Sequence, residues 1–172
     1  MGIILMSSTP QKLVPNRYHV VPRTIFFIFF KDQVLLLKGA ANKKINAGLW
    51  NGLGGHIERG ETIISSAQRE LKEEAGIWCE KPILCGTIMI DVQEDEGILL
   101  FVFGGNVEVT SFINSSEGGL HWFPVDKIPT EDVVDDVEPL INRVLQTYKT
   151  GKQFHLLYSY DSSGNRITTY SE

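Results

Sequence analysis

The stretch GGHIERGETIISSAQRELKEEAGI, residues 54–77, places a glycine-rich loop directly before a strongly charged helix. Three carboxylates of that helix, on Glu70, Glu73 and Glu74, are three and four residues apart and therefore share one face. Like charges at that spacing destabilise a helix by about 0.2–0.5 kcal/mol per pair. Clustered carboxylates are also the ligands that hard divalent cations prefer, and a bound ion offsets the repulsion. The stretch therefore predicts either a metal-binding helix or a solvated charged face in which Lys72 lies near the carboxylates.

The helix is expected over residues 62–75. Ile64, Ala67 and Leu71 recur at i, i+3 and i+7, and this spacing predicts that they form its buried stripe. Gly76 follows directly, where a helix commonly ends in a left-handed glycine.

Two common phosphate-binding motifs can be tested on the loop. Residues 55–62 have the spacing of the P-loop, but Glu61 stands where the motif needs a lysine against phosphate. The dinucleotide fingerprint fits at Gly52 and Gly54, but Ile57 occupies its third glycine position. Neither motif is therefore present.

The same stretch resembles the motif of the Nudix hydrolase family, G-x5-E-x7-R-E-U-x-E-E-x-G-U, in which U is a bulky apolar residue. Every specified position matches across residues 55–77, from Gly55 and Glu61 to the final Gly76 and Ile77. The resemblance implies an α/β fold of the Nudix type: an α/β/α sandwich with a mixed central sheet. Within it, residues 55–77 would form the loop–helix–loop catalytic motif.

The resemblance also implies a role for each matched residue. The implied metal ligands are the backbone carbonyl of Gly54 and the side chains of Glu70, Glu73 and Glu74. Arg69 would pair with Glu61 and hold the loop against the helix, with Gly55 and Gly76 as structural glycines. The implied cofactor is Mg²⁺, with Mn²⁺ as the alternative, because both suit carboxylate and phosphate oxygens.

Nudix enzymes cleave a nucleoside diphosphate linked to another group, and one carboxylate must take a proton from the attacking water. Glu70 is one candidate for this base. Glu117 is the other, since the branch that degrades oxidised purine triphosphates has a metal-binding glutamate five residues before a Trp-Phe pair, as Glu117 precedes Trp122 and Phe123. A lone loop glutamate is otherwise simply solvated. The expected catalytic residues are Arg69, Glu70, Glu73 and Glu117, with Glu117 also a metal ligand.

Three further segments resemble that branch. GKQFHLLYSY, residues 151–160, resembles its closing strand, and the other two predict substrate contacts. In LWNGLGG, residues 49–55, Asn51 stands where the branch has an asparagine that reads the purine base. In IPTEDVVDDVEP, residues 128–139, Asp135 and Asp136 match an aspartate pair that hydrogen-bonds the base.

The resemblance is incomplete in this region. The branch has a tryptophan shortly before the aspartate pair, where this chain has Val133 and Val134, and Leu53 replaces another aromatic residue. Acidic residues are also common at helix N-termini for capping alone, which is the alternative interpretation of Asp135 and Asp136.

Three functions therefore stay open. The first is hydrolysis of a nucleoside triphosphate to a monophosphate and pyrophosphate, with an oxidised purine such as 8-oxo-dGTP as a candidate substrate. The second is a Nudix hydrolase for ADP-ribose or another dinucleotide or diphosphate. The third is a nucleotide-binding regulatory module without turnover, which the intact set of carboxylates argues against.

Composition bounds the remaining choices. Among 172 residues, 42% are hydrophobic and 22% charged, and the formal net charge of −5 argues against a nucleic acid polymer as partner. The longest apolar run, TIFFIFF, is too short to span a bilayer, and the first residues lack the pattern of a signal peptide. We therefore expect a cytoplasmic protein that binds a small-molecule nucleotide, with no membrane partner, as a monomer or homodimer. Cys79 and Cys85 match no metal or redox motif and are expected to be reduced and buried.

Hydrophobic patterns predict the elements around the motif. We expect an N-terminal extension over residues 1–17 and one domain over residues 18–172. The predicted strands cover residues 26–30, 34–37, 83–92, 98–103 and 120–125. A second helix is expected over residues 135–147, followed by a hairpin in which FHLLYSY and RITTY flank the turn DSSGN.

Overall fold

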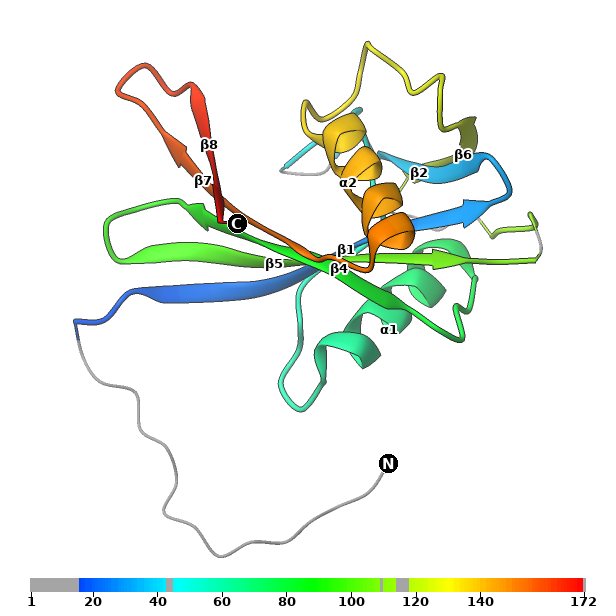
Figure 1. The fold of residues 1–172 in the computed structure, drawn as a ribbon, viewed down its shortest axis with the longest axis horizontal. Helices are drawn as coiled ribbons and strands as arrows, with labels where there is room; N and C mark the ends of the chain where they lie inside the picture. The colour runs from blue at the N-terminus through cyan, green and yellow to red at the C-terminus, as the bar shows by residue number, and fades with distance from the viewer. Residues whose placement is uncertain (1–15, 43–44, 109, 114–117, 172) are drawn as a thin grey trace, which may run out of the picture.

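The computed structural model describes residues 16–42, 45–108, 110–113 and 118–171. These residues form one eight-stranded mixed sheet with a helix on each face, so the predicted α/β/α sandwich is confirmed (Figure 1). The elements are, in order, β1 (His19–Phe30), β2 (Gln33–Gly39), β3 (Trp50–Asn51), α1 (Ile63–Ala75), β4 (Ile83–Asp91), β5 (Glu96–Asn106), β6 (Gly118–Pro124), α2 (Val137–Thr150), β7 (Phe154–Tyr160) and β8 (Arg166–Ser171).

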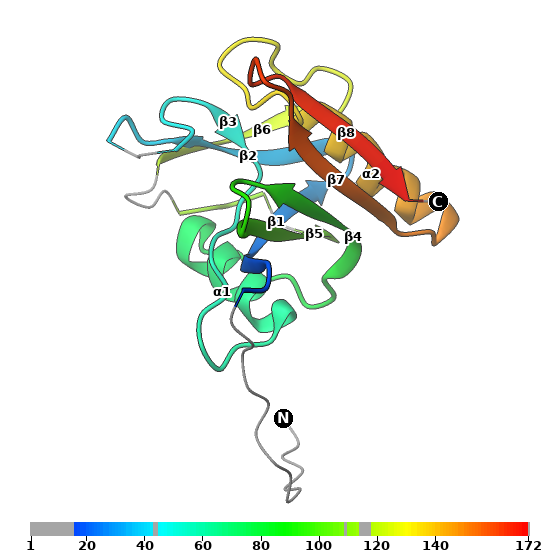
Figure 2. The same cartoon turned by 90° about the vertical axis from the view of Figure 1, so that its left-hand side faces the viewer.

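The strands lie in the order β3-β2-β1-β5-β4-β7-β8, and β6 pairs with β2 beside that path. β1 runs parallel to β5, and β4 runs parallel to β7. The other pairs are antiparallel, including the predicted β7–β8 hairpin, which lies at the front of Figure 2.

The apolar run in β1 is unbroken because both of its faces are buried. Ile25, Phe27 and Phe29 pack in the cluster that includes the apolar face of α2. Phe26 and Ile28 point to the opposite side and pack in the cluster that includes α1. Strand alternation thus uses every residue of the run, and the sheet is covered on both faces.

α1 begins at Ile63, one residue after the predicted start, and hydrogen bonds cap both of its ends. Thr62 accepts a hydrogen bond from the Ser65 N–H, and the Ser65 hydroxyl in turn accepts one from the Thr62 N–H, which forms a capping box. Gly76 ends the helix with φ of +68°, the left-handed conformation that glycine adopts without strain.

The predicted buried stripe of α1 is wrong at its first position. Ile64 is 46% exposed, whereas Ala67 and Leu71 are buried as predicted. Ile63 makes the first-turn contact with the core instead. Periodicity predicts a helix face, but it does not show which first-turn residue overlies the sheet.

Several element bounds also differ from the sequence prediction. β1 begins at His19 rather than at residue 26, because it pairs with β5 along its whole length, including the polar part. The second helix begins at Val137, so Asp135 and Asp136 precede it.

Cys79 and Cys85 are free and buried, as expected. In the part of the chain that the structure describes, no helix has the length and apolar character needed to cross a membrane.

Candidate active site

The glycine loop is fixed to β1 by backbone hydrogen bonds. Leu53 and Phe26 exchange two such bonds, with N–O distances of 2.6 and 3.1 Å, and the Thr24 N–H donates to the Gly55 carbonyl at 2.8 Å. Gly54 has φ of +142°, and a Cβ there would collide with the Thr24 carbonyl. The close approach of loop and strand therefore requires glycine at position 54.

Gly55 makes room for the first carboxylate of the helix. A Cβ at this position would collide with the carboxylate of Glu70, whose side chain is largely buried. Burial raises the pKa of Glu70, while the neighbouring Arg69 lowers it. Glycine at 55 thus lets a partly desolvated carboxylate lie directly against the loop.

Arg69 joins the loop to the acidic face of α1, and its predicted ion pair with Glu61 is confirmed. Its Nε and Nη2 bind the two oxygens of Glu61 at 2.6 and 3.0 Å. Its Nη1 contacts Glu70 at 2.9 Å and Glu73 at 3.0 Å. The bond from Arg69, with a further one from the Glu58 N–H, lowers the pKa of Glu61 to about 2. Arg69 therefore fixes the positions of three carboxylates at once.

Glu74 faces the loop from the buried side of the helix. Glu74 is only 5% exposed, and its Oε2 accepts a hydrogen bond from the Gly54 N–H at 2.7 Å. Glu70, Glu73 and Glu74 nevertheless line one pocket of about 290 Å³, together with Gly54 and Gly55. The three predicted carboxylate ligands therefore line the same pocket as Gly54, whose carbonyl is the fourth predicted ligand.

The donor chemistry of this pocket fits a hard cation, because its side chains offer carboxylate oxygens. Among the described residues, however, no three acidic, histidine or cysteine side chains already converge as a metal-binding group. Arg69 Nη1 contacts both Glu70 and Glu73, and Glu74 is bound to the loop. A bound ion would need carboxylates to exchange these contacts for contact with it. Glu117, the fourth predicted carboxylate, lies outside the described residues.

A second, larger cavity of about 570 Å³ contains all three predicted substrate residues, Asn51, Asp135 and Asp136. The side chain of Asp136 is 14% exposed and that of Asp135 is 73% exposed. Asp136 is the N-cap residue of α2 but makes no side-chain capping hydrogen bond, which argues against capping as its role. Burial raises its pKa, against the opposing effect of Arg166.

The sequence did not reveal three residues that complete this cavity, Tyr158, Tyr160 and Arg166. Arg166, from β8, binds the Asp135 carboxylate with 2.7 Å between Nη1 and Oδ1, and its guanidinium lies 4.6 Å from the ring centroid of Tyr158 on β7. Val134, one of the two valines at the place of the tryptophan in the oxidised-purine branch, lines the cavity. The aromatic side chains in the lining are instead those of Tyr158 and Tyr160. The resemblance of residues 151–160 to the closing strand indicated the strand but gave Tyr158 and Tyr160 no role in the site, and no local pattern marked Arg166.

The fold and these two pockets match what the loop–helix motif implies: a larger cavity lies beside a pocket that offers carboxylate oxygens next to a glycine loop. Comparison with known proteins agrees: residues 20–144 match the NUDIX domain family. The chain therefore belongs to the Nudix hydrolase family.

Particular relatives narrow the comparison. The chain is 33% identical over 116 residues to the oxidized purine nucleoside triphosphate hydrolase of Danio rerio, covering 66% of this chain and 73% of that protein. It is 32% identical over 137 residues to the 8-oxo-dGDP phosphatase NUDT18 of Mus musculus, covering 77% of this chain and 40% of that protein. A crystal structure of the mutator MutT protein from Bacillus halodurans shares the fold, with a TM-score of 0.71, 24% identity, and coverage of 88% of this chain and 97% of that one.

Proposed function

We propose that this protein hydrolyses nucleoside triphosphates to a monophosphate and pyrophosphate, with an oxidised purine such as 8-oxo-dGTP as the preferred base. The observation that carries the proposal is the adjacency of two pockets. Asn51, Asp135 and Asp136 line the larger one, and the carboxylates of the loop–helix motif line the smaller one. A relative named for hydrolysis of oxidised purine nucleoside triphosphates supports the choice of substrate.

The chain's own residues have distinct roles in this reaction. Glu70, Glu73, Glu74 and the carbonyl of Gly54 would hold Mg²⁺, with Mn²⁺ as the alternative. Such an ion, when bound, neutralises phosphate oxygens and lowers the pKa of an attacking water. Glu70 is the described candidate for the base that takes the water's proton, and Glu117 remains the second candidate. Arg69 positions the carboxylates and does not itself react.

Base recognition follows from the unequal environments of the two aspartates. Asp135 is bound to Arg166, whereas burial of Asp136 favours its protonated form. Both carboxyl groups line the cavity, and such a group donates a hydrogen bond to the edge of a base where it is protonated and accepts one where it is ionised. With the amide of Asn51, this set suits the altered donor and acceptor pattern of an oxidised purine.

The test compares kcat/KM for 8-oxo-dGTP and dGTP, with Mg²⁺, in the parent and in Asn51→Ala and Asp136→Ala. A pocket that hydrogen-bonds its ligand rejects an unmatched analogue by up to ~10⁴–10⁵, and the missing tryptophan makes us expect a smaller ratio. Both variants should lose the preference but retain hydrolysis. Asp132→Asn is the control, because Asp132 pairs with Lys38 outside the cavity.

Product analysis separates the other candidate functions. Release of monophosphate and pyrophosphate supports the proposal, whereas turnover of ADP-ribose or a dinucleotide alone would replace it with the second function. Binding without turnover of any of these substrates would indicate the regulatory module. A parent that treats both purines alike would remove the base preference and leave only the general reaction.

A further inference from the structure

Arg23 lies where the cavities of the proposed active site meet. A third cavity, of about 250 Å³, lies beside the two already described and shares Asn51 with the larger one and Glu74 with the smaller. Arg23 and Gly54 line all three. A ligand that reaches from the base cavity to the carboxylate pocket must therefore pass Arg23.

The side chain of Arg23 has an unsatisfied donor. Its Nε is buried and has no hydrogen-bond partner among the described residues. The other arginines at the site differ, because Arg69 is bound to Glu61 and Arg166 to Asp135. Buried donors in proteins are nearly always paired, so an unpaired one at a cavity wall is a place for a ligand oxygen or for an ordered water that a ligand oxygen can replace.

The backbone holds Arg23 firmly in place. It lies in β1, opposite Leu100 of the parallel strand β5, and forms a bridge with His56 on its other side. Its Cα position is therefore fixed from both sides, as is suitable for a residue that must meet a ligand in a defined geometry.

Charge decides which ligand group belongs at this point. The carboxylate pocket is lined by Glu58, Glu70, Glu73 and Glu74. Among its described lining residues, Arg23 is the one arginine or lysine. Arg69, which lies nearby, is already paired with Glu61. An anionic group near these carboxylates is repelled unless a cation faces it. The planar guanidinium matches a phosphate with two parallel hydrogen bonds.

We propose that Arg23 binds the phosphate group attached to the nucleoside, the one that stays on the monophosphate product. This inference rests on the proposed function, because it places the nucleoside in the larger cavity and the remaining phosphates among the carboxylates. Arg23 is then a substrate-binding residue that acts on the first phosphate, while the carboxylates act on the chain beyond it.

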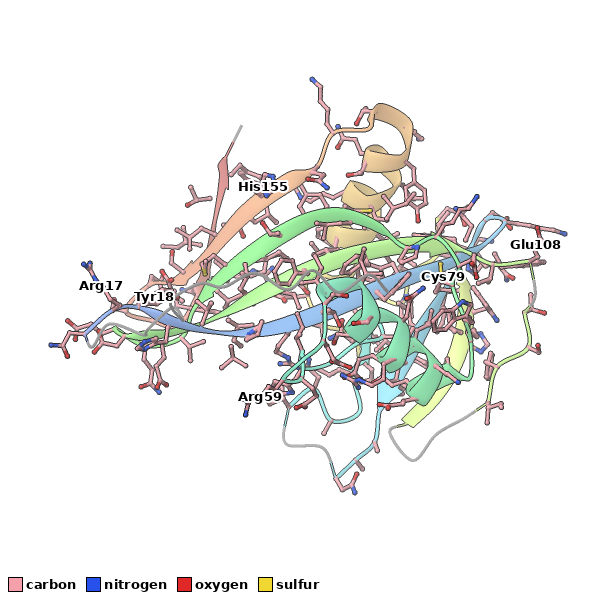
Figure 3. The ribbon with its side chains drawn as sticks, turned by 90° about the horizontal axis from the view of Figure 1, so that it is seen from below. Arg17, Tyr18, Arg59, Cys79, Glu108 and His155 are labelled. Carbon is pink, nitrogen blue, oxygen red and sulfur yellow. The ribbon has the colours of Figure 1, made fainter. Side chains whose placement is uncertain are left out.

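The experiment measures binding without turnover. Isothermal titration calorimetry in the presence of chelator gives the Kd of 8-oxo-dGMP and of the nucleoside 8-oxo-dG for the parent, Arg23→Gln, Arg23→Lys and Arg59→Gln. Arg59 is the control because it is exposed on the loop before α1 and lines none of the three cavities (Figure 3). The Arg59→Gln substitution removes one positive charge close to the site, as Arg23→Gln does.

We expect Arg23→Gln to weaken binding of the monophosphate by ~10- to 100-fold, the range for one or two lost charge-assisted bonds, and to leave nucleoside binding unchanged. Arg23→Lys should fall between parent and Gln, and Arg59→Gln should match the parent. Thermal melting checks that each variant is folded. If Arg23→Gln fails to fold, Arg23→Lys decides by the same comparison.

The outcomes separate this inference from the proposed function. Equal monophosphate affinity in the parent and Arg23→Gln overturns the inference, whatever triphosphate is hydrolysed. Equal weakening of nucleoside and monophosphate also overturns it, because the contact would then not be to phosphate. If the parent shows the Arg23-dependent affinity but releases no monophosphate from any triphosphate, the proposed function fails and the phosphate contact stands.

Discussion

Replacing Glu61 by Gln tests whether the fork between Glu61 and Arg69 holds the catalytic loop on α1. The change keeps the shape of the side chain but removes the charge and one of the two acceptors. The two bonds of the native pair measure 2.6 and 3.0 Å, between side chains that are 19% and 28% exposed, and the glutamine oxygen can keep only one of them. The stabilisation by this half-buried pair is therefore expected to fall between two known ranges. Exposed ion pairs contribute about 0.2–1 kcal/mol, and hydrogen bonds to charged groups contribute about 1.5–3 kcal/mol.

We expect Glu61→Gln to lower the free energy of unfolding by about 1–3 kcal/mol, which in a domain of this size corresponds to a fall in Tm of about 2–12 °C. Because the fold lowers the pKa of Glu61 from 4.5 to about 2, the stabilisation is present above pH 4.5 and is lost as the pH falls towards 2. The difference between parent and variant should therefore be constant above about pH 5 and shrink below it.

Urea unfolding at pH 7 and pH 3 measures this difference, with Glu58→Gln as the matched control on the same loop. Glu58 is exposed, and its link to Glu61 uses its backbone N–H, which the substitution keeps. Loss of an outer contact of this kind costs about 10- to 100-fold in metal affinity or activity. A Glu61→Gln protein as stable as Glu58→Gln and as active as the parent would refute the role given to the ion pair.

Three other predictions concern residues of the carboxylate pocket and of the larger cavity. Glu74→Gln, or a chelator, should reduce release of monophosphate at least ~10²-fold, since a carboxylate essential to the charge of the pocket is lost; undiminished turnover would exclude the metal role. Gly55→Ala should lower kcat while circular dichroism stays unchanged, because the new methyl displaces the Glu70 carboxylate; parental kcat would mean that this displacement is harmless. Because burial raises the pKa of Asp136, its ionisation weakens the folded state as the pH rises above the unfolded value of about 3.9. The Tm of Asp136→Asn should therefore rise relative to the parent between pH 3.5 and pH 7, and a constant difference would contradict the shift.

The loop–helix motif could be predicted from sequence because its contacts are local. Helical geometry alone places Glu70, Glu73 and Glu74 near one another, and the Glu61–Arg69 pair spans only the loop and two turns of helix. The sheet was equally accessible, since a buried apolar strand such as β1 is visible in its composition. The bounds of the strands were harder to predict, because the polar start of β1 depends on its pairing with β5.

The base cavity could not be derived in the same way. Asp135 and Asp136 were predicted only through a resemblance, and their partner Arg166 reaches them from β8 after the chain has passed through α2 and β7. Arg23 likewise has no local signal, because its importance arises from the meeting of β1, the glycine loop and α1. Such contacts depend on strand order and register, which no short pattern encodes.

The position of β8 at the end of the sheet has a consequence for protein engineering. The phosphate end of the groove is built into α1 and the loop fixed to β1, whereas Tyr160 and Arg166 sit on the outermost hairpin, which has a neighbouring strand on one side only. Replacements there leave the core in place, because Tyr160 is exposed and no described side chain of β8 belongs to the buried core clusters, although a change at Arg166 removes its contacts with Asp135 and Tyr158. Libraries randomised at these two positions should therefore yield mostly folded variants, from which selection can recover new base specificities while the hydrolytic machinery stays intact.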